Sequence, residues 1–463
     1  MYVEQLYTNC LAEAAYYIES NGEAAIIDPL RETAPYLQKA AERQAKIKYV
    51  FETHFHADFV SGHIDLARKS GAQIVYGPEA HTQYDVINAQ DGQEFSVGDL
   101  RIRVLHTPGH TLESSCYLLL DASGKPHCIF TGDTLFVGDV GRPDLLDGVM
   151  TKEELASKMY DSLNQKIKTL PDDVIVYPAH GPGSACGKSM GKETFSTIGI
   201  QKSTNYALQD MTREAFIEAV TDGLTSPPKY FFEDARINKT GYNPVDEVIA
   251  TNAHALTVAE VEAAVQQGAL ILDTRAADVF EKGFIPGSLN IGLNGMFAVW
   301  VGTLVDIDQS LVLVTDPGKE EETVLRLARV GYEKVSGYLN GGIQTWITAG
   351  KAIETVTSIE PEHIATYYGN ADYIILDVRK PSEYETEHIK GAINIQLSEI
   401  SARLGELNLE KKYIVHCAAG YRSMMAASIM KAHGLHNFTN VVNGWNGIKK
   451  TDLPKLSSVP EPI

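Results

Sequence analysis

The sequence predicts a multidomain α/β protein, and three observations support this fold class. The length of 463 residues corresponds to about three domains of average size. Short apolar, strand-like runs alternate with helical segments through the first half of the chain, which is typical of layered α/β domains. The second half contains an internal repeat whose two copies each read as a small α/β unit.

The composition is that of an ordinary globular protein, with 44% hydrophobic and 22% charged residues. A net charge of −20 disfavours nucleic acid or an anionic membrane as a partner, because both require a basic surface. No apolar run is long enough to span a membrane, and the first residues lack the pattern of a signal peptide. We therefore expect a cytoplasmic protein.

The five cysteines are widely spaced, and no Cys-x-x-Cys pair occurs among them. An odd number of isolated cysteines in a long chain disfavours both a disulfide framework and a structural zinc site. Three of them, Cys10, Cys116 and Cys128, lie in apolar settings, so we expect them to be inert.

The first domain is expected to cover residues 1–250. Strands are predicted at the apolar runs "EAAIIDP", "KYVFET", "AQIVYG", "LRIRVLHT" and "DVIVYPAH", and helices at "ETAPYLQKAAERQ" and "KEELASKMYDSLNQKI". Residues 236–248 are polar and contain Gly and Pro, so we expect them to form a linker.

The repeat follows this linker. The stretch "LILDTRAADVFEKGFIPGSLNIGL" from Leu270 aligns without a gap to "IILDVRKPSEYETEHIKGAINIQL" from Ile374, a shift of 104 positions. A period of this length indicates a duplicated domain rather than a solenoid. We expect the two copies to cover residues 255–353 and 358–456.

Candidate metal ligands are concentrated in four segments of the first domain, "THFHADF", "HTPGHT", "FTGDTLF" and "YPAHGPG". Most of these segments lie where an apolar run ends in a loop marked by Gly or Pro, so rigid strands can present their side chains to one point. The segments contain His54, His56, Asp58, His106, His110, Asp133 and His180. Together they predict a metal site.

This set of segments resembles the metallo-β-lactamase superfamily, whose signature is T-H-x-H-x-D-H followed by later His, Asp and His ligands. The resemblance implies an αββα sandwich. In members with two metals, the last His of the signature binds the second metal, but here Phe59 stands at that position. His63, four residues further on, is not expected to replace it. The second metal site should therefore be absent or weak.

Within this superfamily, the persulfide dioxygenase branch keeps one iron. The resemblance to that branch implies one Fe(II) per chain, bound by His54, His110 and Asp133. Two imidazoles and one carboxylate suit non-haem Fe(II) and O₂ chemistry. The neighbouring groups would then orient the ligands or face the substrate, although direct ligation by them stays open; they are His56, Asp58 and His180.

Two further segments fit the persulfide dioxygenase branch, and the second also resembles the longer dioxygenase–rhodanese fusions. In "DVGRPDL", Arg142 either holds an anionic group of a thiol cofactor or forms a structural salt bridge. In "GPGSACGKS", Cys186 near Lys188 is either a reactive thiolate or part of a loop that grips the substrate without cysteine chemistry.

In the last copy, the apolar run "YIVH" ends at Cys417, and the loop "CAAGYRS" leads into a predicted helix. Backbone N–H groups at such a helix start favour a thiolate or a bound anion. The copy resembles the rhodanese family, which implies that Cys417 carries a sulfane sulfur and that a cradle surrounds it. The cradle residues are Ala418, Ala419, Gly420, Tyr421 and Arg422. In the middle copy the equivalent position is Asp316, so we expect that copy to be a degenerate rhodanese domain.

Together these resemblances imply a persulfide dioxygenase–sulfurtransferase that acts in sulfide detoxification. Its substrates would be a low-molecular-weight thiol persulfide, O₂, and sulfite or thiosulfate, and similar fusions form dimers or tetramers. A zinc-dependent thioester hydrolase like glyoxalase II is one alternative. A non-catalytic sulfur carrier or sensor is another.

Overall fold

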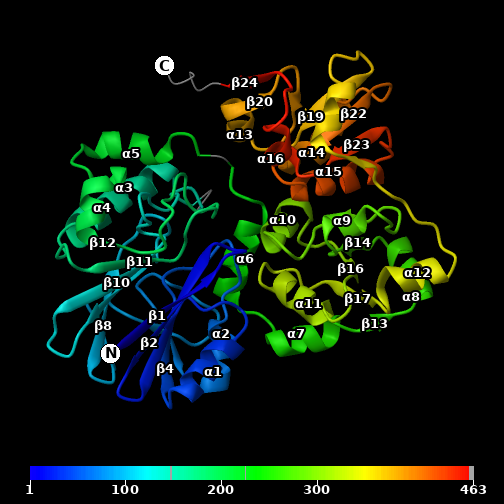
Figure 1. Cartoon of the computed structure of the whole chain (residues 1–463). Coiled ribbons are helices and arrows are strands. Elements are labelled where there is room, and N and C mark those ends of the chain that lie inside the picture. Colours follow the sequence, from blue (N-terminus) through cyan, green and yellow to red (C-terminus); the bar gives the residue numbers. More distant parts are fainter. Residues whose placement is uncertain (146–148, 225, 458–463) are drawn as a thin grey trace. The chain divides into compact units, whose positions relative to one another are not determined.

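The computed structural model describes residues 1–145, 149–224 and 226–457 (Figure 1). The chain folds into two compact units. The first begins at Met1, ends at Val248 and also includes Leu325–Tyr332; the second begins at Ile249 and includes the rest of the C-terminal half. The two predicted rhodanese copies therefore share one unit, apart from Leu325–Tyr332.

Two six-stranded sheets form the first unit. The first sheet has strands in sequence order, antiparallel from β1 to β3 and parallel from β3 to β6. Its strands are β1 (Tyr2–Thr8), β2 (Glu13–Ser20), β3 (Glu23–Ile27), β4 (Lys46–Phe51), β5 (Gln73–Tyr76) and β6 (Ile87–Asn88). The helices α1 (Ala34–Glu42) and α2 (His63–Ser70) pack against β4 (Figure 1).

The second sheet is antiparallel except between β10 and β11. Its strands are β7 (Glu94–Val97), β8 (Leu100–His106), β9 (Ser115–Leu120), β10 (Pro126–Gly132), β11 (Ile175–Pro178) and β12 (Ser196–Thr197). Its helical elements are α3 (Lys152–Ser162), the π turn Leu163–Ile167, α4 (Ile198–Thr204), the 3₁₀ turn Tyr206–Leu208 and α5 (Arg213–Thr221).

The core of this unit follows from the alternation of side chains along the strands. In β2, Tyr16 and Ile18 point into the cluster between the two sheets, whereas Tyr17 points toward α1 and α2. In β9, Leu119 joins the cluster between the sheets and Leu118 joins the cluster under α3 to α5. Where both faces are covered, as in β2, β3 and β9, the strands are largely continuous apolar runs. In β8, apolar residues alternate with arginines that are less buried. The unit is an αββα sandwich, as predicted.

The segment predicted as a linker is largely helical instead. Two helices, α6 (Tyr230–Thr240) and α7 (Val245–Asn252), cover most of residues 236–248. The side chain of Asn238 is fully buried and donates hydrogen bonds to the carbonyls of His56 and Phe59, each at 2.8 Å. Most polar side chains of this segment are exposed, but Asn238 uses its polar side chain for buried hydrogen bonds.

The second unit confirms the duplication. Its two main sheets are fully parallel and have equivalent strand orders, β13-β17-β16-β14-β15 and β18-β23-β22-β19-β21. The first copy contains β13 (Ala255–Leu256), α8 (Val258–Gln266), β14 (Leu270–Asp273), α9 (Ala277–Phe280), β15 (Leu289–Asn290), α10 (Phe297–Leu304), β16 (Leu311–Val314), α11 (Glu320–Ala328), β17 (Val335–Leu339) and α12 (Gly342–Thr348).

The second copy adds a two-stranded antiparallel sheet of β20 and β24 to the same plan. It contains β18 (Ser358–Ile359), the 3₁₀ turn Pro361–Thr366, β19 (Tyr373–Asp377), α13 (Pro381–Thr386), β20 (Glu387–Ile389), β21 (Ile393–Asn394), the 3₁₀ turns Leu397–Glu399 and Leu404–Glu406 around α14 (Ile400–Arg403), β22 (Lys412–His416), α15 (Tyr421–Ala432), β23 (Phe438–Val441), α16 (Gly444–Ile448) and β24 (Lys455–Ser457).

Residues that match across the repeat make the same contacts. Arg275 forms a buried ion pair with Asp273, and Arg379 forms the equivalent pair with Asp377. The amide of Asn290 donates to the carbonyls of Asp273 and Arg275, just as its counterpart in the last copy donates to those of Asp377 and Arg379. The residues that are identical in the two copies therefore fix the ends of β14 and β19. Among the described residues, no helix is long and apolar enough to cross a membrane.

Candidate functional site

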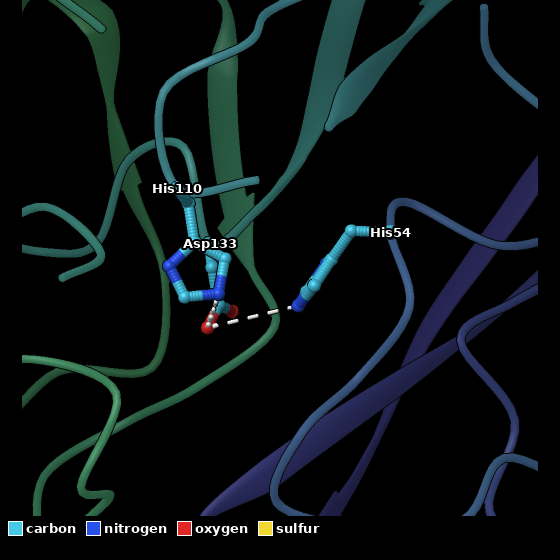
Figure 2. Close-up of side chains that lie close together, drawn as sticks. All are labelled: His54, His110 and Asp133. Carbon is cyan, nitrogen blue, oxygen red and sulfur yellow. Dashed lines mark ion pairs between the residues drawn. The ribbon is translucent and has the colours of Figure 1, made fainter. Parts of the chain in front are cut away.

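Three side chains of the first unit meet at one point just beyond the ends of its strands. His54 follows β4, His110 follows β8 and Asp133 follows β10 directly. The Nε2 atoms of His54 and His110 lie 3.9 Å and 3.4 Å from Oδ2 of Asp133. Figure 2 shows the two imidazoles converging on the carboxylate from different loops. The structure therefore brings the three predicted iron ligands together.

Hydrogen bonds fix the tautomer of both imidazoles. The hydroxyl of Thr53 donates to Asp28 at 2.8 Å, so at 2.9 Å it accepts from Nδ1 of His54. Nδ1 of His110 donates to the carbonyl of Arg142 at 2.8 Å. Each Nδ1 therefore carries the proton, which leaves the lone pair of each Nε2 directed at the carboxylate.

The donor set fits a divalent metal. All three side chains are buried, and Nε2 of His110 and both carboxylate oxygens of Asp133 have no hydrogen-bond partner among the described residues. Burial lowers the pKa of His54 well below its usual range, so this imidazole is neutral. Buried polar atoms without partners are costly unless a further group binds them. Two neutral imidazoles and one carboxylate would hold Fe(II) or Zn²⁺.

His180 lies on the other side of the same carboxylate. It follows β11, and its Nε2 lies 3.4 Å from Oδ1 of Asp133 and 3.4 Å from Oδ2 of Asp58. Its Nδ1 donates to the carbonyl of Ala12 at 3.3 Å. Asp58 and His180 are therefore placed as the sequence predicted, next to the ligands.

His56 points away from the three-donor set. Its Nε2 lies 3.1 Å from Asp28 and 3.6 Å from Glu52. Burial opposes protonation of His56, but the attraction of Asp28 and its neighbouring carboxylates outweighs it and raises the pKa to about 9. A nitrogen of His56 still lies within 4.8 Å of donor atoms of Asp58 and His180. These three residues form a second group that has the composition of a metal site.

Phe59 occupies the position of the missing ligand. Its side chain is fully buried, and its ring packs against His56 in a tilted arrangement, with 4.4 Å between the ring centroids. An aromatic ring offers no donor atom to a metal in this position. Compared with the superfamily signature, the second group therefore lacks one imidazole.

Two further histidines near the site have other partners. Nε2 of His106 donates to the carbonyl of Leu112 at 2.8 Å, which does not support the ligand role considered from the sequence. Nε2 of His63 lies 2.7 Å from the hydroxyl of Tyr84, and burial lowers the pKa of His63 to about 3. Neither histidine belongs to the donor groups described above.

The guanidinium of Arg142 forms the structural salt bridge considered from the sequence. Its Nε and Nη2 donate to Asp144 at 2.6 Å and 2.8 Å, and Nη1 donates to the carbonyl of Ala185 at 3.3 Å. The side chain is buried. Because the carbonyl of Arg142 accepts from His110, this salt bridge orders a loop that orients a metal ligand.

Cys186 is buried beside the metal ligands, but its surroundings do not favour a thiolate. Burial raises the pKa of its thiol well above the usual range, and the charge of Asp133 raises it further. The ammonium of Lys188 does not offset this, since it donates to the carbonyls of Ala219 and Asp222 at 2.6 Å and 2.9 Å. The geometry therefore favours the alternative without thiolate chemistry.

In the second unit, the loop after β22 surrounds the sulfur of Cys417. The backbone N–H of Gly420 donates to this Sγ at 3.1 Å, and α15 begins at the next residue, Tyr421. Gly420 has a φ of 98°, a conformation that favours glycine. The guanidinium of Arg422 is held by Glu383 through two hydrogen bonds of 2.6 Å and 2.8 Å. One residue of the predicted cradle, Gly420, therefore faces the sulfur with its N–H.

The remaining cradle residues are fixed by their backbone. The carbonyls of Cys417 and Ala418 accept hydrogen bonds from the N–H groups of Trp445 and Asn446 at 2.7 Å and 2.9 Å, and Ala419 is exposed at the tip of the loop. In the middle copy, Asp316 is exposed in the equivalent loop, and glutamates fill the first turn of α11.

Comparison with known proteins places these features in families. Residues 8–180 match the Metallo-beta-lactamase superfamily, and residues 257–349 and 360–451 each match the Rhodanese-like domain. A crystal structure of a metallo-beta-lactamase from Staphylococcus aureus subsp. aureus COL is 34% identical, with a TM-score of 0.65, and the match covers 73% of this chain and 98% of that one. This chain belongs to the metallo-β-lactamase superfamily. Two rhodanese-like domains follow its metallo-β-lactamase domain.

Other relatives cover less of the chain. A hydroxyacylglutathione hydrolase from Tolumonas auensis is 36% identical over 169 residues, which is 36% of this chain and 60% of that protein. The chain thus spans 60% of the length of the first curated relatives that it matches. The crystal structure of ETHE1 from Myxococcus xanthus is 31% identical and covers 52% of this chain and 98% of its own, with a TM-score of 0.44.

Sequence reasoning missed the residues that support the ligands of the metallo-β-lactamase domain. Asp28 and Thr53 orient His54, and Asp28 and Glu52 hold His56. Asp28 and Glu52 each end an apolar strand, and this was a signal that could have been used. Asn238 had no comparable signal, because it contacts a loop far away in the sequence.

Proposed function

We propose that this protein is a persulfide dioxygenase joined to a sulfurtransferase, which acts in sulfide detoxification. The observation that carries the proposal is the donor set of His54, His110 and Asp133, which lies next to a signature position filled by Phe59. A single metal held by two imidazoles and one carboxylate suits Fe(II) chemistry with O₂. The tandem rhodanese-like domains, one of which keeps Cys417, support a substrate that contains sulfane sulfur.

The proposed reaction is RSSH + O₂ + H₂O → RSH + SO₃²⁻ + 2 H⁺. The outer sulfur loses four electrons, O₂ gains them, and the S–S bond breaks. Bound Fe(II) would supply the O₂ chemistry that closed-shell Zn²⁺ cannot provide. His54, His110 and Asp133 would hold the iron, and their burial keeps bulk water away from it.

The residues beside the donor set have proposed roles in binding and orientation. Asp58 and His180 would face the substrate or the ligand Asp133, at the 3.4 Å distances described above. Cys186 would line the pocket as a neutral thiol, and Arg142 would keep His110 in its ligating tautomer. The carrier of the persulfide would be glutathione, coenzyme A or another small thiol.

Cys417 would move sulfane sulfur in the second active site. Its thiolate would attack the outer sulfur of a persulfide or of thiosulfate, an S–S bond would form at Cys417, and the thiol or sulfite would leave with the electron pair. The N–H of Gly420 and the N-terminus of α15 would stabilise the negative sulfur. Concentrations of sulfite and thiosulfate would set the direction.

A second candidate is a zinc-dependent thioester hydrolase. The printed name of the curated relative, hydroxyacylglutathione hydrolase, favours this activity. So does the second donor group of His56, Asp58 and His180, which would bind another zinc ion if His56 turned away from Asp28. A third candidate, a sulfur carrier or sensor without catalysis, does not account for the complete donor set of the first site.

The test is metal content together with turnover. Protein reconstituted with Fe(II) should contain about one iron per chain and consume O₂ with at least one persulfide from a panel of glutathione, coenzyme A and bacillithiol persulfides. Two zinc ions per chain with hydrolysis of an acylglutathione thioester would support the second candidate. Partner binding without any turnover would support the third.

A further inference from the structure

A tyrosine next to the Cys417 loop contacts the middle rhodanese-like domain. Tyr421 is the first residue of α15 and follows Gly420, whose N–H faces Cys417. Its hydroxyl donates to the carbonyl of Gly292 at 2.7 Å. Both residues belong to the second unit of the fold, so the contact lies within one compact body.

The middle domain has small residues where the ring of Tyr421 packs. A Cβ atom at Gly295 would lie 2.9 Å from Cζ of the ring, and one at Gly292 would lie 3.3 Å from Cε2. Neither glycine has a positive φ that would by itself require glycine. The close approach of the tyrosine ring therefore explains both positions.

A second contact holds the same face of α15. The hydroxyl of Ser428 accepts a hydrogen bond from the backbone N–H of Asn290 at 3.1 Å. Ser428 lies seven residues after Tyr421, which places both side chains on one face of the helix. Asn290 is fixed in turn, because its side chain donates to Asp273 and Arg275 at the end of β14. The middle domain thus grips the helix at two points.

These contacts determine where the start of α15 lies relative to the sulfur. The helix N-terminus and the N–H of Gly420 are the groups that favour a negative charge on Cys417. We propose that the middle domain, which lacks the cysteine, is retained as a positioning partner: Tyr421, seated on Gly292 and Gly295, holds the Cys417 loop in the conformation that stabilises the sulfur anion. The catalytic consequence rests on the proposed sulfur transfer, but the structural one does not.

The experiment compares the full-length protein with three variants. Tyr421→Phe removes only the hydroxyl, and Gly295→Ala places a methyl group against the ring. Gly283→Ala is the matched control in the same domain, since a Cβ there meets only the flexible end of Ile353 at 3.4 Å. The readouts are hydrogen exchange of residues 418–424, the pH profile of Cys417 alkylation, and kcat and KM for sulfur transfer from thiosulfate to cyanide.

We expect exchange about fivefold faster in Tyr421→Phe, the effect of losing one hydrogen bond, and faster still in Gly295→Ala. The alkylation profile should move to higher pH in both variants, and kcat should fall more than KM changes. Gly283→Ala should match the unsubstituted protein. If Gly295→Ala does not fold, Tyr421→Phe alone decides the result.

Unchanged exchange and an unchanged alkylation profile in Tyr421→Phe would overturn the inference. Failure of the proposed function would look different: Cys417 of the unsubstituted protein would form no persulfide with thiosulfate. In that case a loosened loop in Tyr421→Phe would still support the positioning role, because exchange and alkylation do not depend on turnover.

Discussion

The phenylalanine at position 59 packs against His56 without offering a lone pair to a metal. Its ring contacts a histidine that Asp28 and Glu52 already hold. We attribute the single metal that we propose for this site to two features of the second donor group. One is a missing ligand, and the other is a histidine engaged by carboxylates.

The change Phe59→His tests the first cause. The imidazole is smaller than the ring that it replaces and would complete the second donor group with Asp58 and His180. We expect bound metal to rise from about one toward two equivalents per chain, measured by elemental analysis after zinc reconstitution. Phe55→His, at another buried phenylalanine of the same loop, is the control and should stay at about one. A Phe59→His protein that also stays at one would contradict the role given to Phe59.

Asp234 gives the first unit a pH dependence. Neither carboxylate oxygen has a hydrogen-bond partner among the described residues. Burial raises the pKa of Asp234 well above its ordinary value of 3.8, and the charge of Asp58 raises it further. The folded state therefore keeps a proton that the unfolded chain loses above that value. Stability must fall as the pH rises from about 4 toward the raised pKa.

The variant Asp234→Asn should remove this loss. Relative to the unsubstituted protein, its free energy of unfolding should rise between about pH 5 and pH 8, by at most about 1.4 kcal/mol per pH unit. Urea unfolding of metal-free protein at several pH values measures the difference. The control Asp85→Asn, at an exposed position, should show no trend. A parallel pH dependence of Asp234→Asn and the unsubstituted protein would show that Asp234 ionises normally.

At single positions, the sequence identified the residues that bear donor atoms but not their partners. His54, His110 and Asp133 are recognisable because each follows an apolar strand in a motif of fixed spacing. The tautomer-fixing contacts of Thr53 and Arg142 depend on loops that meet only in the folded chain. For the same reason, the direction of the Lys188 ammonium could not be predicted from its nearness to Cys186 in the sequence.

Among the helices and strands, α6 is the element whose polar composition led to a wrong prediction, that of a linker. Its polar residues suggested a solvated linker. Asn238 instead forms three hydrogen bonds to the backbone of the loop after β4, at His56, Phe59 and Ser61. The strands were easier to predict, because burial on both faces produces apolar runs that stand out. A polar residue with buried partners cannot be told from an exposed one without knowing those partners.

The variant Asn238→Ala should therefore destabilise the first unit. It leaves two carbonyls and one N–H of the metal loop unpaired, at a cost of about 3 kcal/mol. Urea unfolding measures the loss, and faster removal of metal by a chelator should accompany it. Asn88→Ala, at an exposed side chain of β6, is the control. Unchanged stability in Asn238→Ala would mean that the hydrogen bonds from α6 do not stabilise the loop after β4.

At the scale of the whole molecule, we assign the two proposed reactions to separate domains. Cys417→Ser should abolish sulfur transfer from thiosulfate but leave O₂ consumption with a persulfide largely intact, because the donor set of the first unit is unchanged. Asp316→Ala in the middle domain should leave both activities at their original level. Assays of the two reactions on the same preparations provide the comparison. Loss of O₂ consumption in Cys417→Ser would show that the two sites do not act separately.

The domain plan was the most predictable feature of the molecule. Asp273 and Arg275 recur as Asp377 and Arg379 because each pair forms the same buried ion pair in its own parallel sheet. This shared structural requirement explains why the residues are identical in both copies. The retention of the middle domain was less predictable. Nothing in the sequence links Gly292 and Gly295 to Tyr421, and only the fold shows that these glycines accommodate its ring.

The measurement that tests the central claim most directly is O₂ uptake by protein of known metal content. The account predicts about one iron per chain and O₂ consumption with a small-molecule persulfide, with one sulfite formed for each O₂ consumed. Two zinc ions per chain, hydrolysis of an acylglutathione thioester and no O₂ consumption with any persulfide would contradict it.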